Sequence, residues 1–137
     1  ALRGAHMRTD ISVPLSRLAE FVAEAEAALA KDLPECLAVS YGHVGDGNVH
    51  LNVLPPNGSS CEERDRDIYK AKVIVNAVLD RYAGSISAEH GIGRLKRGDF
   101  ESRLGPVQRE MIERLKAAFD PELRMNPGCQ LALQAAS

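Results

Sequence analysis

The chain has 137 residues, the size of one domain, and 45% of them are hydrophobic, which is enough for a core. A formal net charge of −2 excludes the basic surface of a nucleic-acid-binding domain and the acidic run of a solvating tail. Because only 4% of the residues are aromatic, a large cofactor wholly enclosed by this chain is not expected. No apolar run approaches the roughly 18 residues that a membrane-spanning helix needs.

The first half of the chain predicts a strand, a helix and a β-hairpin. Residues 8–13 alternate polar and apolar side chains, as a half-buried strand does. Residues 14–31 begin with a proline and carry an apolar stripe at helical spacing. Residues 37–43 and 48–54 predict two further strands, joined by the glycine-rich loop 44–47. The stripe of the helix consists of Leu15, Leu18, Val22, Ala25 and Leu29.

The second half predicts a helix, a short strand and a last helix. Residues 60–63 fit a capping box that opens a long helix, and Gly84 is its expected C-terminal stop. Residues 85–89 alternate as a fourth strand. A last helix opens at Pro106, and the tail from 122 to 137 is expected to be irregular. The apolar face of the long helix consists of Ile68, Ala71, Val75, Val78 and Tyr82, and that of the last helix of Met111, Leu115 and Phe119.

The order of these elements is the ferredoxin-like βαββαβ pattern of the α+β class, followed by an extra C-terminal helix. Two helices are expected on one face of an antiparallel sheet, in which the first strand pairs with the third and the fourth. The other face would carry imidazoles and amides, which suit a binding site better than a solvated surface. Its predicted polar side chains are Arg8, Asp10, Ser12, Asn48, His50, Asn52, Ser87 and Glu89.

Two histidines on this face predict half of a metal site. If residues 44–47 form the hairpin loop, His43 and His50 share the open face. A catalytic Zn²⁺ takes three protein ligands, and Glu89 is the preferred third, with Asp46 as the alternative. Two imidazoles and a carboxylate also suit Fe²⁺ or Mn²⁺. One difficulty is that the strand of Glu89 would lie about 10 Å from that of His50, across the first strand.

The segment after the fourth strand adds a candidate base. His90 leaves the strand where glycines release the backbone, and an imidazole beside a metal ligand is well placed to take a proton. Arg94 and Lys96 could offer positive charge to a carboxylate substrate. Residues 91–93, Gly-Ile-Gly, are not a dinucleotide-binding fingerprint, because the third glycine and the long helix after it are absent.

Four segments together resemble a known family. Residues 42–52, Gly-His-Val-Gly-Asp-Gly-Asn-Val-His-Leu-Asn, and residues 87–93, Ser-Ala-Glu-His-Gly-Ile-Gly, resemble the two signatures of the FAD-linked oxidase C-terminal domain. This family includes D-lactate, glycolate and D-2-hydroxyglutarate dehydrogenases. Residues 8–14 resemble its first strand, and residues 119–121 and 125–128 resemble its closing segment. The four matches follow the family's order along the chain.

The resemblance implies roles for individual residues. Two departures from the family pattern bear on them: Arg8 stands in place of Lys, and Cys129 stands in place of the Lys that usually follows Asn-Pro-Gly. The implied metal ligands, commonly for Zn²⁺, are His43, His50 and Glu89; the base is His90; the substrate contacts are Asn52 and Arg8; and the residue near the flavin is Asn126.

The resemblance also implies a function for the chain as a whole. Residues 1–137 would be the single C-terminal, substrate- and metal-binding domain of an FAD-dependent 2-hydroxy-acid dehydrogenase. The FAD-binding domain would be an N-terminal partner outside this chain, and the isolated domain would be inactive. His90 would take the proton of the substrate hydroxyl while hydride passes to the flavin. Three scattered cysteines favour a reduced, cytoplasmic protein; peripheral attachment to the inner membrane and a homodimer are left open.

Two alternatives stay open on the residues alone. The first is a non-catalytic module whose His-His-Glu site stores or senses a metal. The second is a self-contained metal hydrolase, which would need a water-activating base and a closed pocket within this chain. The residues also leave open which 2-hydroxy acid is oxidised.

Overall fold

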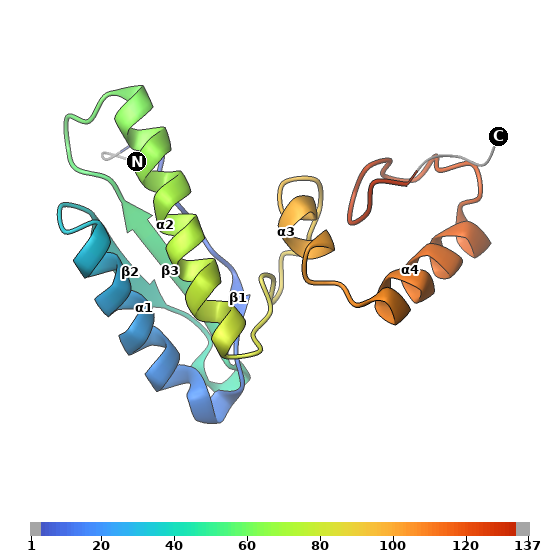
Figure 1. The fold of residues 1–137 in the computed structure, drawn as a ribbon, viewed down its shortest axis with the longest axis horizontal. Coiled ribbons are helices and arrows are strands. Elements are labelled where there is room, and N and C mark those ends of the chain that lie inside the picture. The colour runs from blue at the N-terminus through green and yellow to red at the C-terminus, as the bar shows by residue number, and fades with distance from the viewer. Residues whose placement is uncertain (1–3, 134–137) are drawn as a thin grey trace. The chain divides into compact units, whose positions relative to one another are not determined.

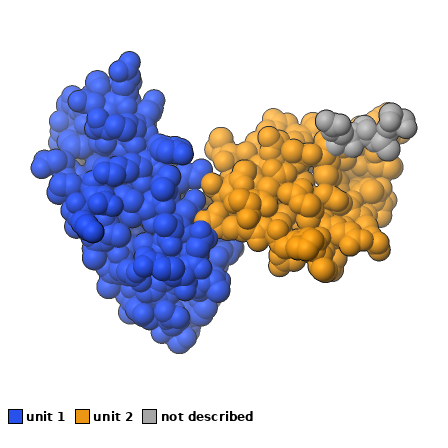
Figure 2. Space-filling model, in the orientation of Figure 1, with its two compact units in different colours: residues 1–90 blue, residues 91–137 orange. Residues whose placement is uncertain are grey.

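The computed structural model describes residues 4–133, and the chain forms two compact units (Figure 2). The first unit consists of residues 1–90 and the second of residues 91–137. Most of the predicted site residues belong to the first unit. Asn126 belongs to the second.

The first unit is a three-stranded antiparallel sheet with two helices. The strands are β1 (Ile11–Ser12), β2 (Leu37–Tyr41) and β3 (Asn48–Leu54), in the order β1-β3-β2. A 3₁₀ turn, η1 (Leu15–Arg17), leads into α1 (Leu18–Asp32), and α2 (Cys61–Arg81) follows β3. Both helices lie on the same side of the sheet (Figure 1). The α+β class is therefore confirmed, and the sheet order is that of the ferredoxin-like pattern.

The core lies between the helices and the sheet. On α1 the predicted stripe is confirmed at Leu18, Ala25 and Leu29 but is wrong at Leu15, which belongs to η1 and is 57% exposed. Phe21 is fully buried and packs edge-to-face on the Tyr82 ring, with 5.5 Å between ring centroids. The α-helix begins at Leu18, so Leu15, in the preceding 3₁₀ turn, is not in register with the buried face of α1.

The predicted capping box of α2 is confirmed. Ser60 Oγ accepts a hydrogen bond from Glu63 N at 3.2 Å, and Glu63 Oε2 accepts one from Ser60 N at 2.8 Å. These two bonds satisfy backbone donors that the first turn of a helix would otherwise leave without partners. The apolar residues that α2 buries are Ala71, Val75, Val78 and Leu79.

The predicted fourth strand does not form. Within residues 85–90 of the described chain, the one ladder contact is an isolated bridge between Ser85 and Ser12. Instead, the backbone N–H groups of Ala88, Glu89 and His90 turn toward the side chain of Asp10. Ala88 N also donates to the backbone carbonyl of Asp10 at 3.1 Å, but among the described residues the N–H groups of Glu89 and His90 bond only to the carboxylate and extend no strand ladder. The alternating pattern of residues 85–89 was therefore misread as a strand.

Two glycines allow loops to lie close against the end of β1. Gly47 has φ +68°, and a Cβ there would lie 2.3 Å from the carbonyl oxygen of Val13. A Cβ on Gly84 would lie 2.2 Å from Leu79 Cδ1 and 2.8 Å from the carbonyl oxygen of Ser12. Since no side chain fits at either position, glycine lets the 44–47 loop and the 85–90 segment approach the same strand.

The second unit contains two helices and an irregular tail. The short helix α3 (Arg97–Glu101) was not predicted, whereas α4 (Pro106–Phe119) begins at the predicted proline. Asp120 ends α4, and its carboxylate accepts hydrogen bonds from Arg124 N at 2.8 Å and Met125 N at 2.9 Å. Arg94, predicted to offer charge to a substrate, donates to the carbonyl of Pro127 at 3.1 Å.

Helix α4 leaves an apolar face uncovered. None of its residues is buried. The charged residues on the rest of its surface form ion pairs, between Arg109 and Glu113 and between Arg114 and Glu110. A helix with one apolar and one charged face normally packs its apolar face against other protein. The large exposed side chains of the apolar face are Val107, Met111, Leu115 and Phe119, which are 57–78% exposed.

Candidate functional site

The open face of the sheet combines polar and apolar side chains. His50 pairs with Tyr41 across β2 and β3, and Asn52 pairs with Val39. Directly opposed residues of a sheet share a face, so the two predicted residues of β3 have apolar neighbours on β2. Tyr41 and Val39 are 57% and 39% exposed. The predicted imidazoles and amides therefore share this face with apolar side chains that the pattern of polar residues did not indicate.

Asp10 organises the segment that carries Glu89 and His90. Its Oδ2 atom accepts hydrogen bonds from Ser87 Oγ at 3.1 Å and from the backbone N–H groups of Ala88 at 3.1 Å, Glu89 at 3.0 Å and His90 at 2.8 Å. Only 2% of Asp10 is exposed, although the strand pattern had placed it on the open face. Successive N–H groups that converge on one anion form a stable nest.

The same contacts keep Asp10 ionised. Burial by itself raises the pKa of the Asp10 carboxyl, because it penalises the charged form. The hydrogen bonds from the backbone of His90 and Glu89 and from the Ser87 hydroxyl outweigh this effect, and the pKa falls from 3.8 to about 2. Asp10 is therefore a fixed negative charge at neutral pH.

Glu89 joins the segment after α2 to the hairpin. Its Oε1 atom accepts hydrogen bonds from His43 Nδ1 at 2.6 Å and from Asn48 Nδ2 at 2.8 Å. The bonds from His43 and from Asn48 lower the pKa of Glu89. The sequence predicted that the strand of Glu89 would be separated from the hairpin by the first strand. Glu89 nevertheless reaches the hairpin, because the chain leaves the sheet after Ser85 and turns around Asp10.

Three imidazole rings lie in a row. The ring centroids of His43 and His50 are 5.9 Å apart, and those of His50 and His90 are 5.8 Å apart, with the second pair stacked. His50 Nδ1 donates to the carbonyl of Thr9 at 3.2 Å, and His43 Nδ1 donates to Glu89. In the neutral form of each ring, Nε2 then carries the lone pair that can accept a proton or bind a metal.

The predicted substrate contacts lie in different surroundings. Asn52 is half-buried on β3, and its Nδ2 atom donates to Tyr41 Oη at 3.3 Å. Arg8 is exposed on the segment before β1, and its Nε atom donates to His6 Nε2 at 3.0 Å. Asn52 therefore belongs to the sheet face that carries His50. The hydrogen bond of Arg8 is with His6, which was not among the predicted site residues.

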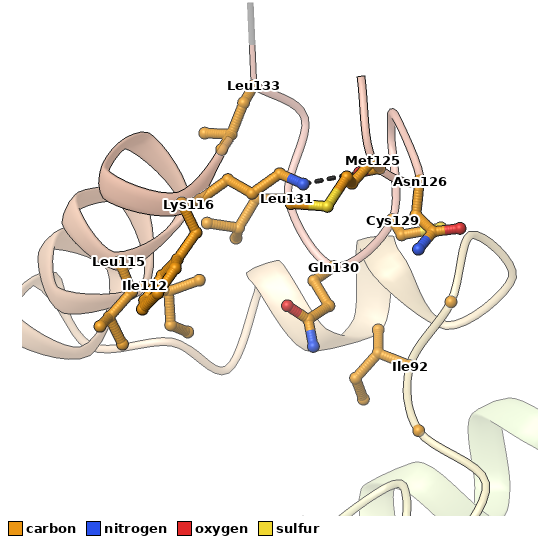
Figure 3. Close-up of a pocket in the computed structure, with 13 residues that line it drawn as sticks. Ile92, Ile112, Leu115, Lys116, Met125, Asn126, Cys129, Gln130, Leu131 and Leu133 are labelled. Carbon is orange, nitrogen blue, oxygen red and sulfur yellow. Dashed lines mark hydrogen bonds between the residues drawn. The ribbon is translucent and has the colours of Figure 1, made fainter. Parts of the chain in front are cut away.

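Asn126, the predicted flavin contact, lines a pocket within the second unit (Figure 3). The residue adopts a left-handed backbone conformation, with φ +49°, and it is exposed. The pocket has a volume of about 710 Å³ and opens between α4, the 91–93 turn and the tail. Its larger apolar lining residues are Ile92, Ile112, Leu115, Phe119, Met125, Leu131 and Leu133.

The cluster fits a metal by its donor chemistry but is not assembled as a metal site. Two imidazoles with available Nε2 atoms and an ionised carboxylate are donors that Zn²⁺ accepts. Among residues 4–133, however, no three His, Cys, Asp or Glu side chains are arranged so that they could hold a metal ion. The Nδ1 atom of His43 donates to Glu89 Oε1 at 2.6 Å, so these two side chains bond to each other instead of pointing at one ion.

Sequence reasoning assigned no role to three residues that shape this cluster. Asp10 holds the 87–90 backbone, Thr9 holds the His50 ring, and Tyr41 lies against that ring with 5.3 Å between the centroids. Thr9 and Asp10 belong to segment 8–14, which resembles the family's first strand, and this position could have indicated that they contribute to the site. For Tyr41 the signal was its pairing position opposite His50 in the hairpin.

The family model described as "FAD linked oxidases, C-terminal domain" matches residues 2–129. This match covers the hairpin, the Asp10 nest and the closing segment in one stretch. The chain therefore belongs to the family of FAD-linked oxidase C-terminal domains.

Curated relatives carry the names of particular dehydrogenases. A D-2-hydroxyglutarate dehydrogenase of Stutzerimonas stutzeri is 38% identical over 121 residues, which is 88% of this chain and 26% of that protein. A probable mitochondrial D-lactate dehydrogenase of Danio rerio is 37% identical over 91% of this chain and 24% of its own length. A D-lactate dehydrogenase of Anaerostipes hadrus is 34% identical over 87% of this chain. The chain spans about a quarter of the length of these relatives.

Within residues 4–133, no helix combines the length and the hydrophobicity that crossing a lipid bilayer requires.

Proposed function

We propose that this chain is the substrate-facing C-terminal domain, over residues 1–137, of an FAD-dependent dehydrogenase that oxidises a 2-hydroxy acid. The observation that carries the proposal is the exposed cluster of His43, His50, Glu89 and His90 on the open side of the sheet. The family and the names of the relatives support the class of reaction. D-2-hydroxyglutarate and D-lactate are the proposed substrate types, with glycolate as a smaller candidate.

In this proposal the residues of the chain hold the substrate and move one proton. His90 takes the proton of the 2-hydroxyl group at its ring nitrogen, for which its 66% exposed side chain is accessible. Asn52 binds a substrate oxygen through its amide, and Arg8 pairs with the carboxylate. A bound flavin supplies the acceptor for the hydride that leaves C2. Asn126 is proposed to lie near that flavin.

The flavin-binding partner is proposed to be an N-terminal part of the same polypeptide. The relatives are about four times as long as the match, so most of their length lies outside the region shared with this chain. The uncovered apolar face of α4 supports an arrangement in which further protein packs on this domain. We expect the chain alone to be inactive. The cytoplasmic location and the homodimer stay predictions.

The first prediction is that the full-length parent protein reduces its flavin with a 2-hydroxy acid. Anaerobic addition of D-2-hydroxyglutarate, D-lactate or glycolate should reduce the flavin and so lower its absorbance band at roughly 450 nm. L-enantiomers are the matched control for the chiral substrates. A parent that binds a metal but reduces no flavin with any of these acids would favour the metal-storage alternative. A parent without flavin would overturn the proposed class.

The second prediction concerns a divalent metal, which His43, His50 and Glu89 are proposed to hold. When bound, a metal of this kind would lower the pKa of the substrate hydroxyl. Calorimetric titration with Zn²⁺ should show binding to the chain, and His43→Ala, His50→Ala or Glu89→Gln should each weaken it at least about tenfold. His6→Ala is the matched control, because His6 lies outside the cluster. Equal weakening by His6→Ala would show that the site is wrongly assigned.

A further inference from the structure

We propose that Asp10 is a positioning residue, which orients Glu89 and His90 by holding the backbone from which they project. The proposal rests on the proposed function and deepens it. The oxygen Oδ2 of Asp10 accepts from three successive backbone N–H groups, at 3.1, 3.0 and 2.8 Å, and from the Ser87 hydroxyl. The backbone carbonyl of Asp10 also accepts from Ala88 N at 3.1 Å.

No ladder of hydrogen bonds holds this segment instead. After the bridge at Ser85, residues 86–90 belong to no strand or helix in the described chain. The direction in which Glu89 and His90 leave the backbone is therefore set by where their N–H groups point. Those groups point at one buried oxygen atom, whose residue is 2% exposed and lies next to a strand.

The two side chains that leave this backbone reach different members of the cluster. Glu89 contacts His43 and Asn48, and the His90 ring stacks on His50 with 17° between the ring planes. Rotation of the 88–90 backbone would move both contacts together. A single carboxylate, about 80 residues away in the sequence, thus couples the candidate base to the candidate metal ligands.

Asp10 acts through the backbone rather than as a partner of the imidazole. The distance between Asp10 Oδ2 and His90 Nδ1 is 3.7 Å, which is longer than a hydrogen bond. The distance between the same oxygen and His90 N is 2.8 Å. A catalytic aspartate that fixes a histidine tautomer would show the reverse pattern.

Three variants separate this role from a general effect on folding. Asp10→Asn keeps the size and one acceptor oxygen, Asp10→Ala removes the acceptor, and Ser87→Ala removes one donor while the three backbone donors stay. In the 137-residue chain, NMR should detect contacts between the ring protons of His50 and His90 in the wild type and in Ser87→Ala. We expect Asp10→Ala to lose these contacts while the shifts of Phe21 and Leu51, in the core, stay dispersed.

In the full-length parent, Asp10→Ala should lower kcat by about 10- to 100-fold with little change in KM or flavin content, and Asp10→Asn should restore part of that loss. The positioning role is overturned if the ring contacts persist in Asp10→Ala, or if kcat changes less than twofold. If Asp10→Ala does not fold, Asp10→Asn takes its place in the comparison with Ser87→Ala. The positioning role then requires that Asp10→Asn weakens the ring contacts and lowers kcat more than Ser87→Ala does, and equal effects of the two variants overturn it. A wild-type parent that reduces no flavin refutes the proposed function, and the NMR result still decides the positioning role.

Discussion

Replacing His90 by alanine in the full-length parent should lower kcat by about 10²- to 10⁴-fold, the usual contribution of a general base. The His90 ring is 66% exposed and stacks on His50. It belongs to no hydrogen bond of the cluster, so its loss leaves the contacts of His43 and Glu89 intact. The measurement is the rate of flavin reduction in stopped flow, at saturating substrate.

The metal content of the His90→Ala parent gives the control for this result. Metal and flavin content should equal those of the wild type, because the proposed ligands are His43, His50 and Glu89. Glu20→Gln should leave kcat unchanged, since Glu20 pairs with Arg17 on the exposed surface and lies outside the cluster. Loss of metal together with turnover would mean that His90 is a ligand and that another group takes the proton.

Acid should destabilise the first unit through Asp10. The pKa of Asp10 is about 2 in the folded chain and 3.8 as a free side chain. As the pH falls below 3.8, the Asp10 carboxylate becomes protonated in the unfolded chain but stays ionised in the folded chain. The stabilisation is therefore complete above pH 3.8 and is lost as the pH falls through 2. A difference of just under two pH units corresponds to about 2 kcal/mol in the free energy of unfolding.

Urea unfolding between pH 2 and pH 6 measures how this free energy of unfolding depends on pH. Tyrosine fluorescence reports on the first unit alone, because all three tyrosines lie in residues 1–90. The advantage of the wild type over Asp10→Asn should shrink on acidification. Glu20→Gln is the control: the pKa of Glu20 is also lowered, by Arg17, but this pair is exposed and should contribute little. An advantage that stays constant with pH would show that the Asp10 carboxyl is not held ionised in the fold.

Local patterns were good predictors of the helices. The capping box at residues 60–63 and the proline at Pro106 each mark a helix start within one or two residues. Such signals depend on hydrogen bonds between residues three or four apart, which the sequence displays directly. The prediction of α1 was weaker, because Leu15 belongs to a 3₁₀ turn and is exposed, and because the buried Phe21 was absent from the predicted stripe.

The sequence by itself determined the α+β class and the hairpin that places His43 and His50 on one face. Only the tertiary structure decided that Glu89 and His90 reach this hairpin, and how they do so. The alternation of residues 85–89 predicted a strand, yet a carboxylate about 80 residues away draws the N–H groups out of the ladder. A buried charge satisfied by three N–H groups outweighs a local preference for strand, and no short-range pattern displays that competition.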